Sequence, residues 1–436
     1  MRPALTRAQE RKAVAAATIG CGLEFYDFLT YAYFAIQIGE TFFPSHDKYL
    51  SLMGSLGAFA AGFAGRPLGA WVLGGYADRA GRKPAMLLSM TMMGLAIATL
   101  ALCPGYRTIG LAAPVIVVLA RFVQGLALGG EIGSATVYMV EAGAIERRGR
   151  NAAAQGVCQG IALTLGAAVG FGLSSIMGAE ALAAWGWRVA LLLGVSIVPF
   201  ALVLRRSLPE TAGSPEPELP AMARGPSLRQ AIWCGGAIMA AGTIVNYLEA
   251  YMTTFGQTQL HLPTRLAMAG QLAGNLLIIA AALLGGALCD RYGRRPLLLW
   301  PQLAFTMTIL PMIAWLDASR TLSLFFAINI LMGVLNNING PALYVAVAES
   351  LPPERRSRGF ALIYSLPIAL FGGTTQLFLT WLLKVTGTPL AVGWYMTLVG
   401  AAGFIACWLL PESAPVKRGW KAPCDDLTIA GALPTV

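Results

Sequence analysis

The chain has 436 residues, of which 56% are hydrophobic and 12% are charged, whereas about a quarter of the residues of an ordinary soluble domain are charged. A mean hydropathy of +0.64 excludes a water-soluble enzyme and leaves no room for a separate soluble catalytic domain. The formal net charge is +10, which in a soluble protein would suggest nucleic acid as a partner. The seven cysteines are scattered singly, so the sequence predicts neither a disulfide framework nor a zinc site.

Twelve apolar runs follow one another along the chain. A hydrocarbon core of about 30 Å needs about 20 mostly apolar residues per helix, and Gly, Pro and charged residues separate the runs. The predicted spans cover approximately 14–40, 50–75, 85–104, 110–140, 152–177, 187–205, 230–256, 264–288, 297–316, 322–348, 360–384 and 391–411. Continuous apolar runs of this length exclude an outer-membrane barrel.

The basic residues are divided unevenly between the two sets of loops. With an even number of spans, both ends of the chain lie on one side, and the loops there hold 23 of the 31 Lys and Arg residues. The positive-inside bias then predicts that both termini are cytoplasmic. Because topology accounts for the positive charge, we expect no nucleic-acid partner.

The second half of the chain repeats features of the first. GGYADRAGRKP at 74–84 recurs as GGALCDRYGRRP at 285–296, and Leu-Pro-Glu follows both the sixth and the twelfth span. The duplication predicts two pseudo-symmetric six-helix bundles, 1–206 and 230–412, with a cytoplasmic linker at 207–229 and a cytoplasmic tail at 413–436. Two such halves around a central cavity are typical of transporters that work by alternating access.

Several segments resemble the major facilitator superfamily: the repeated turn, and Arg121-Phe122-Val123-Gln124-Gly125 in the fourth span. Others resemble its metabolite:proton symporter group, namely Glu24-Phe25-Tyr26-Asp27-Phe28, Arg66-Pro67-Leu68-Gly69 and Gly129-Gly130-Glu131-Ile132-Gly133. The stretches at 104–114 and 204–211 are similar to the citrate and tricarballylate branch of that group. The resemblance implies an all-α membrane fold of twelve transmembrane helices.

The resemblance also implies that the repeated turn latches the two halves together on the cytoplasmic side. The expected gate comprises Gly74, Asp78, Arg79, Gly81, Arg82, Asp290, Arg291 and Arg294. In physical terms, the glycine permits a tight reversal, and the aspartate can accept hydrogen bonds from cations or from a helix N-terminus. Alternatively, the cations of the turn only fix the topology.

Six charged residues lie in the bilayer interior, away from the ends of the predicted spans: Glu24, Asp27, Arg66, Arg121, Glu131 and Glu249. Charge is costly in a bilayer, so such side chains usually face the bundle interior or a watery cavity. Arginine stays charged and suits a carboxylate, whereas a desolvated carboxylate can take up a proton. We expect Arg66 and Arg121 to meet an anionic substrate, and one or more of Glu24, Asp27 and Glu131 to carry a coupled proton. The alternative is a set of permanent ion pairs between spans one, two and four.

Polar side chains at helical spacing supply the other expected substrate contacts. They are Tyr26, Gln124, Gln159, Asn246, Tyr247, Glu249, Asn275 and Asn336. For any isolated amide, a hydrogen bond between helices is the competing interpretation.

Together these features predict a secondary transporter of the inner membrane rather than an enzyme. We expect a monomer that imports a small organic anion, a di- or tricarboxylate such as citrate, with protons and without a cofactor or metal. No GxxxxGK[ST] motif occurs, so a gradient must supply the energy. The alternatives are uptake of a zwitterionic osmolyte such as betaine or proline, efflux by antiport, and a non-transporting membrane sensor.

Overall fold

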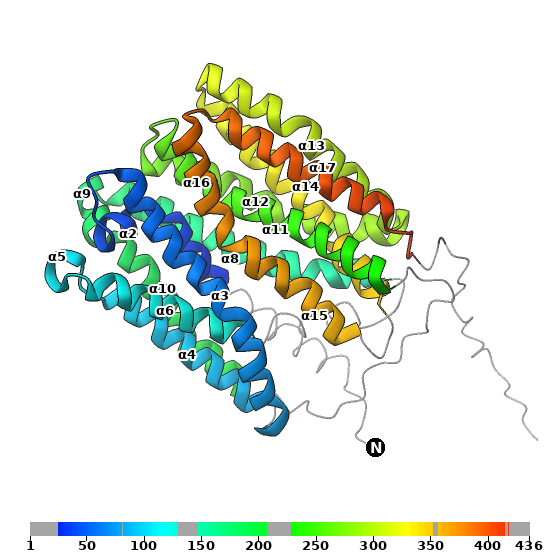
Figure 1. Ribbon diagram of the computed structural model, residues 1–436, viewed down its shortest axis with the longest axis horizontal. Helices are drawn as coiled ribbons and strands as arrows, with labels where there is room; N and C mark the ends of the chain where they lie inside the picture. Colours follow the sequence, from blue (N-terminus) through cyan, green and yellow to red (C-terminus); the bar gives the residue numbers. More distant parts are fainter. Residues whose placement is uncertain are drawn as a thin grey trace, which may run out of the picture.

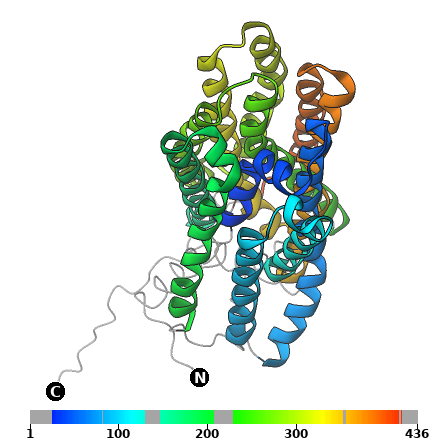
Figure 2. The same cartoon turned by 90° about the vertical axis from the view of Figure 1, so that its left-hand side faces the viewer.

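The protein is almost entirely helical. The computed structural model describes residues 25–80, 82–129, 147–206, 228–351, 356–414 and 417, and these residues form helices, turns and short connections without a strand. Figures 1 and 2 show the long helices running side by side. Nine of the described helices are long and apolar enough to cross a membrane. Over the residues that the structure describes, each of the twelve predicted spans coincides with helix, which confirms the all-α membrane fold.

The first half contains six helical spans. Residues 25–33 are helical and continue, after a turn at Phe34, into α2 (Ala35–Phe42). The other long helices are α3 (Lys48–Ala80), α4 (Arg82–Leu102), α6 (Ala112–Gly129), α8 (Arg148–Ile176) and α10 (Trp187–Arg206). The short α5 (Tyr106–Ile109), α9 (Ala179–Ala181) and η2 (Leu182–Gly186) join spans at one end of the bundle (Figure 1).

The second half repeats this arrangement. Its helices are α11 (Leu228–Thr258), α12 (Thr264–Tyr292), α13 (Arg294–Ser319), α14 (Leu322–Glu349), α15 (Arg356–Pro367), η4 (Ile368–Gly372), α16 (Thr374–Thr386) and α17 (Leu390–Leu409). The eleventh span is thus three pieces, with a π turn directly after Pro367. Proline lacks a backbone N–H, and π turns recur where helices are interrupted.

Large apolar side chains cover the outward-facing surface. Trp71 and Trp233 are each 78% exposed, and Leu95, Leu398 and Trp315 are similarly open. In a water-soluble protein such a surface would promote aggregation, whereas in a bilayer it faces lipid tails of matching polarity.

Glycines let α3 and α6 pack backbone to backbone. A Cβ at Gly69 would lie 1.8 Å from the carbonyl oxygen of Leu126, and one at Gly125 would lie 1.5 Å from the carbonyl oxygen of Gly62. In membranes, small residues permit this close packing between helices. The contact brings Arg66 on α3 and Arg121 on α6 into the same layer of the bundle.

The two halves meet along two pairs of helices. Gly156 and Gly160 of α8 pack against Ala282 and Ile278 of α12, while Gly373, just before α16, packs against Ala60 of α3. Because both contacts depend on small residues, each half can approach the other closely while remaining a separate bundle.

We expect Gly69→Ala to destabilise the protein by about 1–3 kcal/mol, because the methyl group would overlap the α6 backbone. The matched control is Gly57→Ala in the same helix, where a Cβ would have no neighbour within 4 Å. Thermal unfolding of the two purified variants in detergent measures the difference. Equal stability of the two variants would show that the close contact is not needed.

Candidate functional site

A carboxylate, an amide and a guanidinium form a cluster inside the first half. Asp27 lies in the first span, and Arg121 and Gln124 are three residues apart on α6, so both face the same neighbour. Gln124 bridges the other two, because its Nε2 donates to Asp27 Oδ2 and its Oε1 accepts from Arg121 Nη1. Arg121 Nη1 also lies 3.7 Å from Asp27 Oδ2. All three residues are at most 1% exposed, so this is a charge pair held out of water.

Aromatic rings enclose the rest of the arginine. The Arg121 guanidinium carbon lies 3.7 Å from the Tyr31 ring centre and 5.0 Å from that of Phe28. Cation–π attraction strengthens when the groups are desolvated. Among the described residues, Arg121 Nε and Nη2 and Asp27 Oδ1 have no hydrogen-bond partner. The cluster therefore keeps hydrogen-bonding capacity that a proton or a rearranged neighbour could use.

The second intramembrane arginine, Arg66, approaches the same aromatic ring, Phe28. Its guanidinium carbon is 4.9 Å from the Phe28 ring centre and 4.3 Å from that of Phe63. It also interacts with the hydroxyl of Tyr247 on α11, in the other half. Two guanidinium groups thus share the Phe28 ring, one paired with Asp27 and the other directed towards the second half.

Arg66 lines a cavity of about 80 Å³ between the two halves. The first half also contributes Phe25 and Gln159, and the second half contributes mainly amides and hydroxyls. The polar residues from the second half are Thr243, Asn246, Tyr247, Gln302, Asn336, Asn337, Asn339, Tyr344 and Tyr364. Gln159 Nε2 donates to Asn246 Oδ1 at 3.4 Å across the cavity. One cation surrounded by neutral hydrogen-bonding groups suits a small, oxygen-rich anion.

Five of the expected substrate contacts line this cavity: Arg66, Gln159, Asn246, Tyr247 and Asn336. Arg121 and Gln124 lie behind Arg66 in the buried cluster. Glu24 and Glu131, two of the three expected proton carriers, fall outside the described residues.

Two expected contacts are directed elsewhere. Tyr26 donates from its hydroxyl to the carbonyl oxygen of Ala190 at 2.9 Å, so it joins the first span to α10. Asn275 donates to Leu163 O at 3.0 Å and to Tyr33 Oη at 3.2 Å. It therefore ties α12 to α8 and to the first span. Both residues therefore form hydrogen bonds between helices, which was the alternative to a substrate contact.

Glu249 is buried on α11, 5% exposed, and does not line the cavity. Its side chain is hydrogen-bonded to Asn336 of α14. Tyr247, two residues earlier, faces the cavity, and two residues on a helix lie on nearly opposite sides. The three-residue spacing between Asn246 and Glu249 suggested that both contact the cavity, but the Glu249 side chain is not among the residues that line it.

Six polar residues of the cavity were not among the expected contacts: Thr243, Gln302, Asn337, Asn339, Tyr344 and Tyr364. Gln302 is a lone amide in an apolar span, and it accepts from Asn339 Nδ2 at 3.5 Å. In the sequence, these residues could be found only as isolated polar residues in long apolar runs. Helical periodicity does not predict which of such residues line the same cavity.

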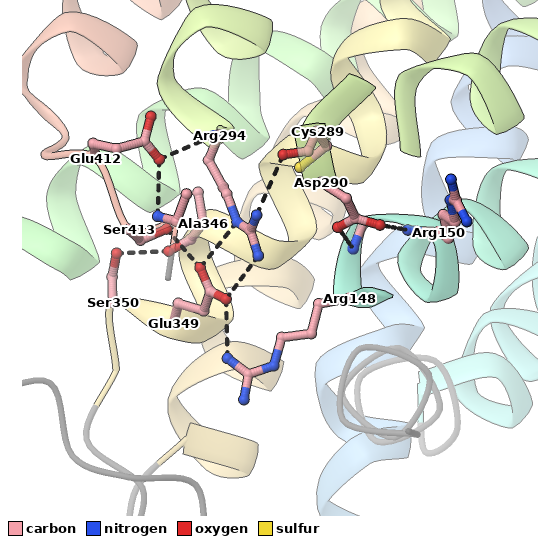
Figure 3. Close-up of polar contacts among 12 residues, drawn as sticks. Arg148, Arg150, Cys289, Asp290, Arg294, Ala346, Glu349, Ser350, Glu412 and Ser413 are labelled. Carbon is pink, nitrogen blue, oxygen red and sulfur yellow. Dashed lines mark hydrogen bonds and ion pairs between the residues drawn. The ribbon is translucent and has the colours of Figure 1, made fainter. Parts of the chain in front are cut away.

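The end of the bundle that carries the repeated turns, here named the turn end, holds a second set of charges (Figure 3). Asp290 at the end of α12 accepts from the backbone N–H groups of Gly149 (2.7 Å) and Arg150 (3.1 Å). These N–H groups belong to the first turn of α8, in the other half, where a negative charge complements the helix dipole. Asp290 thus links the two halves.

Glu349 is the centre of an ion-pair network at the same end (Figure 3). Its Oε1 lies 2.9 Å from Arg148 Nη1 and 3.1 Å from Arg294 Nη2, and its Oε2 accepts from Ser413 Oγ at 2.7 Å. Arg148 belongs to the first half and the other residues to the second. Glu349 was not among the expected gate residues.

Of the other expected gate residues, Arg79 and Arg291 have described surroundings, and neither joins these contacts. Arg79 is exposed, and Arg291 lies over the ring of its neighbour Tyr292 at 5.4 Å. Gly74 and Asp78 belong to α3 and Arg82 to α4, but their surroundings, and Gly81 altogether, lie outside the described part of the chain.

A smaller bridge joins the halves at the opposite end. Lys384 Nζ donates to Asp47 Oδ2 at 2.6 Å, and Gln259 Nε2 donates to the hydroxyl of Tyr49 at 3.1 Å. The hydrogen bond from Lys384, together with that from the Tyr49 N–H, lowers the pKa of Asp47 below its usual value. A lowered pKa means that the bridge is present at neutral pH and is lost as the pH falls through that pKa.

Comparison with known proteins identifies the family. Residues 12–213 match the model of the sugar (and other) transporter family, and residues 268–423 match that of the major facilitator superfamily. The citrate-proton symporter of Salmonella typhi is 33% identical over 96% of this chain and 98% of its own length. The chain belongs to the major facilitator superfamily. It is a multi-pass inner-membrane transporter and not an enzyme.

Two further relatives and one solved structure are similar to this chain over most of its length. The alpha-ketoglutarate permease of Escherichia coli K12 is 32% identical, covering 93% of this chain and 95% of its own length. The proline/betaine transporter of Salmonella typhimurium is more distant, at 26% over 95% of this chain and 86% of its own. The partially occluded inward-open structure of the xylose transporter XylE from E. coli has a TM-score of 0.74 at 15% identity, covering 93% of this chain and 99% of that one.

We expect Glu349→Gln to lower stability by about 3 kcal/mol or more, because Arg148 and Arg294 would be left buried without a counter-charge. Glu40→Gln, at an exposed site, is the control. Thermal unfolding in detergent reports the difference, and an unchanged midpoint in Glu349→Gln would contradict the role given to the network.

At the opposite end, we expect Asp47→Lys to favour opening, because two lysines would face each other. A cysteine in the cavity (Thr243→Cys) should then react faster with a membrane-impermeant thiol reagent added from that side. The double reversal Asp47→Lys/Lys384→Asp should restore the slower rate, and the chain without Thr243→Cys gives the background. Equal labelling of the single and double reversals would show that this bridge does not hold the end closed.

Proposed function

We propose that this transporter imports a small organic anion, a di- or tricarboxylate such as citrate, together with protons. The observation that carries the proposal is the position of Arg66. Arg66 and Arg121 are the two cations within the spans, and Arg121 is paired with Asp27. Arg66 is therefore the cation available to an anion in the cavity, where a planar guanidinium can bind a carboxylate through two hydrogen bonds.

The neutral lining suits the rest of such a substrate. Amides of Asn246, Asn336 and Gln159 and the hydroxyl of Tyr247 can donate to further carboxyl or hydroxyl oxygens. The relatives that are 32–34% identical include two citrate-proton symporters and an alpha-ketoglutarate permease. The substrates in their names are di- and tricarboxylates, which supports the same substrate class here.

Asp27 is the proton carrier that this arrangement favours. While Asp27 is ionised it neutralises Arg121, and when it takes up a proton the two arginines that share the Phe28 ring are both uncompensated. The field at Arg66 then becomes more positive and binds an anion more tightly. By linkage, a bound anion equally favours protonation of Asp27. Proton and substrate thus promote each other's binding, as symport requires.

The membrane potential makes such coupling necessary. Moving one negative charge inward against 100 mV costs about 2.3 kcal/mol, and a trianion costs about three times as much. Protons that accompany the anion offset this cost.

The orientation and architecture follow from the same proposal. The turn end is cytoplasmic, in agreement with the distribution of basic residues, and both termini lie there. Residues 1–206 and 230–412 are the two moving halves, with 207–229 as linker and 413–436 as tail. One chain, with lipid around it, suffices because the cavity lies between its own two halves.

The substrate class is tested by uptake into proteoliposomes under an imposed inward proton gradient. Labelled citrate, tricarballylate, 2-oxoglutarate and glycine betaine are offered in parallel. We expect concentrative uptake of at least one of the carboxylates, and concentrative uptake of betaine alone would contradict the proposal.

If Asp27 carries the coupled proton, its replacement should impair the accumulation of substrate but not the exchange of substrate across the membrane. In Asp27→Asn, the ratio of internal to external substrate under a proton gradient should fall well below that of the unchanged protein, while exchange of labelled for unlabelled substrate continues. Asp317→Asn, on a different helix and outside the cavity, is the matched control. Accumulation at the level of the unchanged protein in Asp27→Asn would overturn the assignment.

Replacing Arg66 tests the anion site. Arg66→Lys keeps the charge but removes the planar fork, so we expect the KM for the carboxylate to rise about tenfold, corresponding to the loss of one charged hydrogen bond. An unchanged KM would show that Arg66 does not hold the substrate.

A further inference from the structure

Glu249 is a buried acid for which the proposed proton and anion sites have no role. It lies on α11, 5% exposed, and among the described residues no Lys or Arg is within ion-pair distance of it. Its Oε1 has no hydrogen-bond partner there. In the interior of the spans the sequence places two cations, Arg121, which is paired with Asp27, and Arg66, which makes no ion pair with Glu249. Among the described residues, Glu249 thus has no counter-charge.

Apart from Arg66, which interacts with the Tyr247 hydroxyl, the polar groups described near this part of α11 are neutral. The Glu249 side chain forms a hydrogen bond with Asn336 of α14. It also interacts electrostatically with the hydroxyl group of Tyr33 in the first span. From α16, Gln376 Nε2 donates to the Tyr247 carbonyl at 3.3 Å and Thr380 donates to the Tyr251 hydroxyl at 2.9 Å. The tyrosine hydroxyl of Tyr33 already accepts from Asn275 of α12. The helix α17 carries no charged residue.

An isolated carboxylate in such surroundings is stable only in its neutral form. Burying an ionised carboxylate without a partner costs so much that the group takes up a proton instead. Glu249 nevertheless has a route to water, because Asn336, its hydrogen-bond partner, lines the cavity. When Asn336 moves, the Glu249 carboxyl can exchange a proton with cavity water.

We propose that Glu249 is a second proton-binding residue of the transport cycle, in the half opposite to Asp27. A proton from cavity water bonds to the carboxylate when the cavity faces outward, and the O–H bond breaks to cavity water when it faces inward. The inference rests on the proposed symport and adds to it. Each half then contributes one acid, and each turnover carries one proton more than Asp27 alone would carry.

The resting state of Glu249 can be tested without any substrate. Infrared spectra of the purified full-length protein at neutral pH should contain a C=O band from a neutral buried carboxylic acid, which is lost in Glu249→Gln. Glu180→Gln, at an exposed site on α9, should leave the band unchanged. A spectrum in which Glu249→Gln removes only carboxylate bands would overturn the proposal. If Glu249→Gln fails to fold, Glu249→Asp replaces it, and the band should shift rather than disappear.

Its role in transport is measured by the accumulation ratio of labelled citrate in proteoliposomes with the membrane potential clamped at zero. Each coupled proton multiplies this ratio about tenfold per unit of imposed pH gradient, since one pH unit corresponds to about 1.36 kcal/mol. At a gradient of one unit, Glu249→Gln should therefore accumulate about tenfold less citrate than the unchanged protein, while Glu249→Asp and Glu180→Gln should retain the full ratio.

The outcomes separate the two proposals. If the unchanged protein concentrates none of the carboxylates, the proposed function fails, whatever the infrared result. If it concentrates citrate and Glu249→Gln reaches the same ratio, the symport stands and the second proton site is wrong. Where another carboxylate of the panel is the one concentrated, the same comparison is made with that acid.

Discussion

The cost of burying charge is the constraint on which the rest of this structure depends. Arg121 is completely buried, and an unpaired guanidinium there would be strongly destabilising. Asp27, Gln124 and the ring of Tyr31 supply the compensation. The glycine contacts between α3 and α6 then bring Arg66 close enough to share the Phe28 ring with Arg121. The proposed anion site and the proposed proton site are therefore two parts of one electrostatic unit.

The same constraint explains how the halves are held. At the turn end, Glu349 compensates two buried arginines from different halves, and Asp290 covers the start of α8. At the opposite end, the Asp47 and Lys384 bridge is more exposed and therefore weaker. Alternating access requires that these two sets of contacts break in turn, while the Asp27 cluster lies within one half and moves with it.

The sequence was sufficient for the fold but only partly for the site. Twelve long apolar runs and a duplicated turn predict the helices, because bilayer thickness fixes their length. The rarity of charge within the spans also selected Asp27, Arg66 and Arg121. Helical periodicity gives the face on which a side chain lies, but not the neighbour it meets. Tyr26 and Asn275 therefore proved to join helices, and Glu249 proved to lie behind the cavity rather than in it.

The central claim is that protonation of Asp27 and anion binding at Arg66 are linked. The most direct test adds citrate to the purified protein in weakly buffered detergent solution and follows proton uptake with a pH-indicator dye. Protons exchanged by citrate itself are common to all variants, so the difference between the unchanged protein and Asp27→Asn isolates this residue. The account predicts greater proton uptake by the unchanged protein at equal citrate occupancy. Equal uptake by the two proteins would contradict it.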